Sequence, residues 1–347
     1  MNNHVCLQRR QWLASSGLLL IQPIGPAFAL TPAPGGEARK SPLVFAVITP
    51  RGSDAALAAW TSFVQRVAQD LGHAITLRAW ESPDPSALAS AFASGEIDLA
   101  WAGNSAALAV VERGAGEVFA QMVTEAGSTG YHAIIVTHRD SGLKTLADAQ
   151  RPGKGLVFAD GETKSFSGHL VPRYYAFVKR GINEPAALYA KVMHGSHINN
   201  LIMAAARKVD LATANDEELA MFRASNPRLA DQLHVLWSSP TLPQSPLVWS
   251  TSLPADLRRR IQQVILSFGK GSATDKDILK KVNNLSAFRK SRNSQLITAG
   301  DIEMFAAWQQ VNNHKGLSDA DRAQRIQAIS ERASRLELRL KLPPSVQ

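Results

Sequence analysis

Short apolar runs of strand length alternate with helical patterns along most of this chain. The run from Leu43 to Ile48 is continuous, which is typical of a strand buried on both faces of a sheet. A helical pattern over residues 55–71 follows, then a strand over 74–80, a helix over about 86–94 and a strand over 97–101. This order predicts an α/β fold with a parallel sheet and helices on both of its faces.

Two further segments predict that the chain crosses into a second lobe and returns. The apolar run from Tyr131 to Thr137 predicts the first crossover, and the Pro-rich stretch from Pro240 to Pro246 leads to the run from Leu247 to Ser250, which predicts the second. Between them the patterns predict helices over 166–179, 198–207 and 216–224 and strands over 155–159, 191–193, 209–213 and 235–237. We therefore expect lobe 1 over residues 42–131 and 246–347 and lobe 2 over 132–245. In such folds ligands lie where strand carboxyl ends meet helix amino ends.

The first residues have the pattern of an export signal. Arg9 and Arg10 precede an apolar stretch from Trp12 to Ile24, which is too short to span a bilayer comfortably. The small residues Ala27 and Ala29 then form a signal-peptidase site, so residues 1–29 are predicted to be a signal peptide and 30–41 a flexible lead-in. An uncleaved anchor is the alternative, and the twin arginines leave Sec and Tat export equally open. Either export route predicts a periplasmic protein.

Composition narrows the function classes. The only cysteine, Cys6, lies in the predicted signal, so the mature chain has no disulfide, thiol nucleophile or cysteine metal site. The net charge is +9, but the basic residues are dispersed, which favours exposed helix faces over nucleic-acid binding. A positive field also helps to collect anions.

The C-terminal stretch from Ser318 to Leu340 is a predicted helix with an apolar stripe. The stripe has helical spacing and comprises Ile326, Ile329, Ala333, Leu336 and Leu340. Such a stripe usually packs within its own domain. A homodimer formed through these C-terminal helices is the alternative.

The segment from Ala159 to Gly168 carries the strongest candidate chemistry. It joins a buried strand to a helix, with Ser165 as the expected N-cap and Ser167 in the first turn. Unpaired backbone N–H groups and the helix dipole can hold an oxyanion there. The alternative is that Ser165 only caps the helix.

Four other segments at predicted strand–helix junctions or crossovers are weaker candidates. His197 precedes a helix and could donate to an anion, adding charge if it is protonated, or could be an ordinary capping histidine. Tyr131 could donate to an oxygen or simply pack. The carboxylates of 213–217 could cap a helix or face a cationic group, and 101–105 favours an ordinary turn.

Several segments together resemble a known family, the phosphate/phosphite/phosphonate-binding proteins of ABC importers. The resemblance covers nearly the whole mature chain and rests on 165–175, 195–197, 209–213 and 243–249. It implies a type II periplasmic-binding-protein fold, with two Rossmann-like lobes joined by two crossovers, and C-terminal helices. It also implies a phosphorus oxyanion as ligand, an ABC permease as partner, and neither cofactor nor catalysis.

In the family, a Ser-Thr-Ser turn, a histidine and a cleft tyrosine hold the phosphorus oxygens. Ser165, Ser167, His197 and Tyr131 match those positions. Phe166 stands where the family usually has Thr, so this position offers only its backbone N–H.

The family's aminoalkylphosphonate binders also use acidic residues for the ammonium group, and here the match is incomplete. Glu217 matches one of these residues, whereas Ser245 stands at the other and the second cleft tyrosine, expected near Pro85, is missing. This makes phosphite, phosphate or a simple alkylphosphonate as plausible as 2-aminoethylphosphonate.

Two other function classes stay open at this point. A periplasmic sensor that presents the same site to a membrane kinase would have the same sequence features. A hydrolase would use Ser165 or Ser167 with His197, but the chain lacks a nucleophile elbow around them. Metal-ligand spacings and Walker or Rossmann loops are likewise absent from the sequence.

Overall fold

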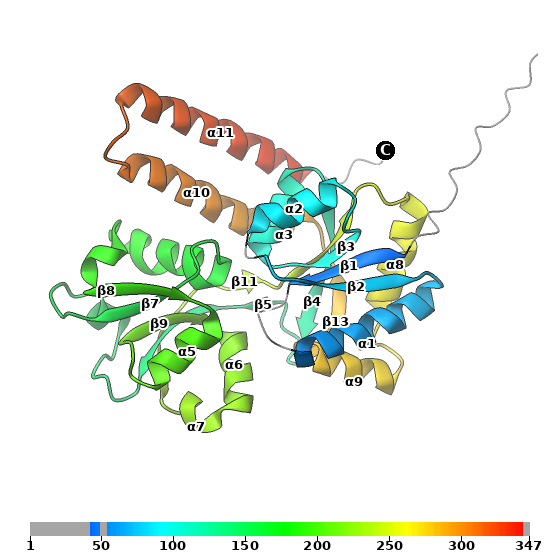
Figure 1. Ribbon diagram of the computed structural model, residues 1–347, viewed down its shortest axis with the longest axis horizontal. Coiled ribbons are helices and arrows are strands. Elements are labelled where there is room, and N and C mark those ends of the chain that lie inside the picture. The colour runs from blue at the N-terminus through cyan, green and yellow to red at the C-terminus, as the bar shows by residue number, and fades with distance from the viewer. Residues whose placement is uncertain (1–41, 49–53, 83, 343–347) are drawn as a thin grey trace, which may run out of the picture. The chain divides into compact units, whose positions relative to one another are not determined.

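The computed structural model describes residues 42–48, 54–82 and 84–342. The predicted signal peptide and lead-in lie outside the described residues. Two separate sheets, each covered by helices, organise the described chain (Figure 1). Each of these sheets forms a lobe together with the helices that cover it: lobe 1 contains the six-stranded sheet and lobe 2 the five-stranded sheet.

Lobe 1 is built on a six-stranded sheet in the order β13-β4-β12-β3-β1-β2. Helices cover both faces, as the sequence predicts. One face packs side chains such as Phe45 against α1, which contributes Trp60 and Phe63, and against α8 and α9, and the other face packs against α2, α3, α10 and α11. The strands are β1 (Leu43–Ile48), β2 (Ile75–Trp80), β3 (Leu99–Trp101), β4 (Gly116–Thr124), β12 (Pro246–Ser250) and β13 (Leu285–Lys290). The helices are α1 (Asp54–Leu71), α2 (Pro85–Ala93), α3 (Asn104–Glu112), α8 (Ala255–Ser267) and α9 (Ala273–Lys281), with α10 (Ile297–Asn313) and α11 (Asp319–Lys341) at the C-terminal end.

Lobe 2 is built on a five-stranded sheet in the order β10-β6-β9-β7-β8. Its strands are β6 (Ala133–His138), β7 (Val157–Gly161), β8 (Lys191–Gly195), β9 (Leu211–Asn215) and β10 (Leu233–Ser238). Its α-helices are α4 (Leu146–Ala149), α5 (His197–Ala205), α6 (Asp216–Ser225) and α7 (Pro227–Ala230). The shorter helical turns are η1 (Phe166–Leu170), η2 (Arg173–Phe177), η3 (Val178–Arg180) and η4 (Pro185–Leu188).

The two segments that join the sheets lie side by side. β5 (Gly130–Tyr131) and β11 (Leu242–Pro243) pair antiparallel, with Tyr131 opposite Leu242. The polypeptide therefore passes between the sheets twice through one short ribbon, which contains the start of the predicted first crossover and part of the Pro-rich stretch before the predicted second. The lobe boundaries at 131/132 and 245/246 stay a prediction.

The predicted parallel sheet forms only part of each lobe's sheet, and the remaining strand pairs are antiparallel. β12 runs antiparallel to β3 and β4, and β6 runs antiparallel to β9 and β10. Both strands follow directly after the crossover ribbon. They therefore enter their sheets from the end opposite to that at which the parallel strands begin. Among the described residues the parallel part comprises β1–β3 in lobe 1 and β7–β9 in lobe 2.

Two helical regions also differ from the sequence pattern. The sequence places 101–105 at a strand–helix junction but gives the helix no bounds, because most residues of α3 are buried and an all-round apolar helix has no amphipathic period. The predicted helix over 166–179 forms as the π-helical turns η1 and η2, followed by η3. Pro172 lies between η1 and η2 and has no N–H to continue an α-helical ladder.

The C-terminal stripe packs within its own chain. Leu336 and Leu340 are buried against Gly300 of α10, where an added Cβ would lie 3.3 Å from both leucine side chains. α10 also contacts lobe 2, because the Arg173 Nε donates to Gln309 Oε1 over 3.2 Å. Homodimerisation through these helices stays a prediction. In the described part of the chain, every helix is too short or too polar to cross a membrane.

Candidate functional site

The candidate serine turn begins where β7 ends. Ser165 caps η1 as predicted, because its Oγ accepts a hydrogen bond from the Gly168 N–H over 3.1 Å. An added Cβ at Gly161 would lie 2.4 Å from the Gly168 carbonyl carbon. Only glycine therefore allows the end of the strand to lie this close to the first turn of η1.

His197 is placed by the start of α5. Ser196 caps this helix, and its Oγ accepts from the Asn199 N–H. The buried Asn200 side chain donates to the carbonyl oxygens of Asp160 and Thr213, each over 3.1 Å. These bonds tie the first turn of α5 to β7 and β9, so the position of His197 is set by the sheet.

Three predicted site residues from three different elements meet at this point. Ser167 Oγ lies 3.3 Å from His197 Nε2. The Tyr131 hydroxyl, on the crossover ribbon, lies close enough to the Ser167 and Asn104 side chains for both to favour its ionised form and so to lower its pKa against the effect of burial. Ser167 and Tyr131 are 6% and 7% exposed, so the three groups form a nearly enclosed polar cluster.

Burial keeps these donors uncharged. It lowers the pKa of His197 to about 4, so the imidazole is neutral at pH 7. It also raises the pKa of Tyr131 to about 12, so the phenol keeps its proton. The sequence left open a protonated His197, and the structure resolves this in favour of the neutral ring. His197 Nδ1 is buried and lacks a protein hydrogen-bond partner.

Glu217, in the first turn of α6, lies near the same cluster. Its Oε1 accepts a hydrogen bond of 2.5 Å from the Gln244 Nε2 on the return segment. Burial raises the Glu217 pKa to about 7 despite this bond, and the charges of Asp216 and Glu218 add to the effect. Asn215, which precedes α6, caps the helix by accepting from the Glu218 N–H.

Two contributors were not among the selected site residues: Asn104 lies in the 101–105 segment that was assigned to an ordinary turn, and Gln244 was not a candidate. Both side chains are buried, and the Asn104 Nδ2 donates to the Pro243 carbonyl over 3.0 Å. Asn104 follows β3 at the start of α3, and this strand-end position was the signal that could have identified it. Gln244 has no comparable local signal, since only the tertiary fold brings it to Glu217.

Phe166 does not direct its side chain to solvent. It is 6% exposed and belongs to the apolar cluster that includes Tyr131, Leu242 and Leu296. Beside it, Lys164 Nζ lies 2.9 Å from Asp84 Oδ1 at the start of α2. The turn of lobe 2 therefore contacts lobe 1 through an apolar side chain and an ion pair.

Removing the Glu217 charge is expected to stabilise the protein at high pH. The folded pKa of about 7 exceeds the ordinary 4.5, so between these values the folded state binds more protons and stability falls as pH rises. Glu217→Gln removes this loss. After allowance for solvent screening, we expect a gain of about 1–2 kcal/mol in the free energy of unfolding at pH 8 and little change at pH 4.5.

Urea unfolding at both pH values measures this difference. Glu162→Gln, at an exposed carboxylate before η1, is the matched control and should behave like the wild type. Equal stability of Glu217→Gln and the wild type at pH 8 would contradict the burial argument.

Comparison with known proteins identifies the family. The family model described as "ABC transporter, phosphonate, periplasmic substrate-binding protein" matches residues 45–296. The chain belongs to this family. Its members are substrate-binding components of ABC transporters, which are not enzymes, so the hydrolase alternative is set aside.

Individual members of the phosphonate-binding family agree over most of their length. The chain is 32% identical to the phosphonates-binding periplasmic protein of Escherichia coli K12, over 89% of each chain. The binding component of a Pseudomonas aeruginosa ABC phosphonate transporter is 30% identical with a TM-score of 0.74, covering 87% of this chain and 98% of that one. A Prochlorococcus marinus protein crystallised with methylphosphonate has a TM-score of 0.66 at 18% identity, covering 76% and 97%. These relatives confirm the expected family and the type II fold.

Proposed function

We propose that this periplasmic binding protein captures a phosphonate, or a related phosphorus oxyanion such as phosphite or phosphate, in a cleft between its lobes. It then delivers the ligand to an ABC permease in the inner membrane. The observation that carries the proposal is the meeting of Ser167, His197 and Tyr131. These groups come from η1, from α5 and from the ribbon that joins the lobes.

The chemistry of the cluster suits a tetrahedral anion. Hydroxyls, a neutral imidazole and the N–H groups of the first turn of η1 all donate hydrogen bonds to oxygen, and a charged acceptor makes such bonds stronger. His197 Nδ1 has no hydrogen-bond partner in the protein, so this nitrogen is available for a hydrogen bond with a ligand. Ser165 Oγ accepts from the Gly168 N–H, and this bond leaves the Ser165 O–H available as a donor to the anion.

The organic end of the ligand is recognised by fewer groups. Glu217 is the acid that matches the family's ammonium site, and the Gln244 side chain already donates to it. Ser245, which is neutral and partly buried, replaces the second acid. A single shared carboxylate is a poor partner for a buried ammonium ion. We therefore propose methylphosphonate, phosphite or phosphate ahead of 2-aminoethylphosphonate.

A ligand panel tests this assignment. Phosphate, phosphite, methylphosphonate and 2-aminoethylphosphonate are compared in a thermal-shift assay, with isothermal titration for each ligand that shifts the midpoint. A ligand at one hundred times its Kd should stabilise the folded state by about 2.7 kcal/mol. Sulfate serves as a tetrahedral control without phosphorus. If no phosphorus oxyanion binds more tightly than millimolar, the ligand is wrong even though the family assignment stands.

A further inference from the structure

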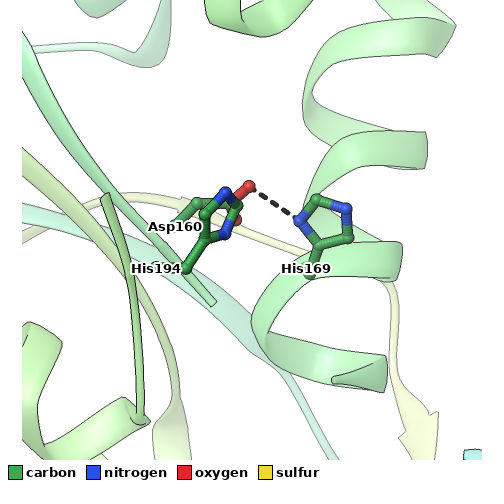
Figure 2. Close-up of side chains that lie close together, drawn as sticks. All are labelled: Asp160, His169 and His194. Carbon is green, nitrogen blue, oxygen red and sulfur yellow. Dashed lines mark hydrogen bonds and ion pairs between the residues drawn. The ribbon is translucent and has the colours of Figure 1, made fainter. Parts of the chain in front are cut away.

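A second group of polar side chains lies on lobe 2, and the proposed anion site does not use it. Asp160, His169 and His194 each offer a ligand atom, and these atoms lie within 4.8 Å of one another (Figure 2). We propose that these three side chains bind one divalent transition-metal ion, with Zn²⁺ as the best match.

The sheet itself fixes two of the three ligands. Asp160 on β7 and His194 on β8 are direct partners in the parallel register of these strands. Residues opposite each other on neighbouring strands project to the same face, so the pairing sets their separation. His169 reaches them from η1, and its ring centroid lies 5.9 Å from that of His194. All three ligands therefore stand on regular secondary structure.

A hydrogen bond holds His194 in the tautomer that can bind a metal ion through Nε2. Its Nδ1 lies 2.8 Å from the Gly161 carbonyl oxygen. A carbonyl can only accept, so Nδ1 carries the proton and Nε2 keeps its lone pair in the neutral ring. A ligating histidine commonly has this arrangement, in which a backbone carbonyl fixes the tautomer through the other nitrogen.

A hydrogen bond joins Asp160 and His169 at the place where a metal ion would bind. His169 Nδ1 lies 2.7 Å from Asp160 Oδ2, and both side chains are largely buried, at 14% and 13% exposure. When a cation binds, the ring proton moves to Nε2 and Nδ1 becomes a ligand beside the carboxylate oxygen. Two nitrogens and one oxygen are a donor set for Zn²⁺, whereas Mg²⁺ and Ca²⁺ prefer oxygen ligands.

The surroundings leave room for water to complete the coordination. The cluster lines a cavity of about 320 Å³ that is bounded by apolar side chains such as Phe158 and Phe177. His194 is exposed at its edge, which gives an ion a path of entry. Arg173 also lines the cavity, but its guanidinium donates to Gln309 Oε1 and to the Asn183 carbonyl.

Zinc titration of the full chain without a histidine tag tests the proposal. Isothermal titration after chelator treatment should give one site with a Kd in the micromolar range or tighter. His194→Gln and His169→Gln should each weaken binding by about tenfold or more. His234→Gln removes an exposed histidine from β10 of the same lobe and should leave the affinity unchanged.

Three outcomes would overturn the proposal. They are millimolar or no binding by the wild type, wild-type affinity in both cluster variants, and an equal loss in His234→Gln. Because His169→Gln removes a largely buried ion pair, its fold is checked by circular dichroism. Cobalt substitution gives a second measurement. Visible d–d absorption of the Co²⁺-loaded wild type, lost in the exposed-site variant His194→Gln, supports the site, and an unchanged spectrum in that variant contradicts it.

Discussion

Ser167→Asp is expected to abolish binding of every phosphorus oxyanion that the wild type binds. The Ser167 hydroxyl is nearly enclosed and contacts both His197 and Tyr131. A carboxylate there would place a negative charge about 4 Å from the ligand. At an effective dielectric constant of about 20, the repulsion amounts to about 4 kcal/mol, or about a thousandfold in affinity. The lost hydroxyl donor adds to this penalty.

Isothermal titration with the tightest ligand of the panel measures the effect. Ser238→Asp introduces the same charge at an exposed position at the end of β10 and should retain affinity close to that of the wild type. A comparable loss in Ser238→Asp would show that the net charge of the lobe, and not the serine turn, controls binding. Undiminished affinity in Ser167→Asp would remove this turn from the site.

Phe166→Ala is expected to lower the free energy of unfolding by about 3–5 kcal/mol, the usual loss for a buried phenylalanine. The Phe166 ring is buried in a cluster that includes Tyr131 and Leu242 of the ribbon and Leu296 of the C-terminal region. Its removal leaves a cavity that these fixed elements cannot close. A residue that the resemblance identifies as a missing hydroxyl donor thus has a packing role.

Chemical denaturation measures this loss, and Phe166→Leu is the matched control. Leucine retains most of the buried apolar volume, so its cost should be clearly smaller than that of alanine. If alanine and leucine cost the same small amount, the ring does not hold the turn against the cluster. Phe166→Thr, which restores the family's usual residue, should show the same large loss as alanine.

The local pattern of the sequence is sufficient for the parallel strands of lobe 1 and for most elements of lobe 2. The predicted strand over 43–48 is β1, and the predicted helix over 55–71 is α1 within one residue. The ribbon contains Tyr131, where the predicted first crossover begins, and part of the Pro-rich stretch before the predicted second. These features follow from apolar periodicity and from capping residues such as Ser165, which act over a few neighbouring positions. The motif resemblance likewise needs only the order and spacing of residues.

Strand direction and the site itself depend on contacts between distant residues. The antiparallel entry of β6 and β12 follows from the pairing of β5 with β11, which no local pattern encodes. Sequence reasoning selected Ser167 and His197 as separate candidates, but only the fold brings them within 3.3 Å. Asn104 and Gln244 join the site in the same way, through elements far apart in the chain.

The sequence by itself determined the succession of strands and helices, the family and the chemical identity of the candidate donors. The tertiary structure alone decided their charge states and partners. Burial makes His197 neutral and raises the pKa of Glu217, because desolvation depends on what surrounds a group. The register of β7 and β8 likewise places Asp160 beside His194, a proximity that sequence spacing does not reveal. Local order is set by neighbours along the chain, whereas electrostatics and ligand geometry are set by neighbours in space.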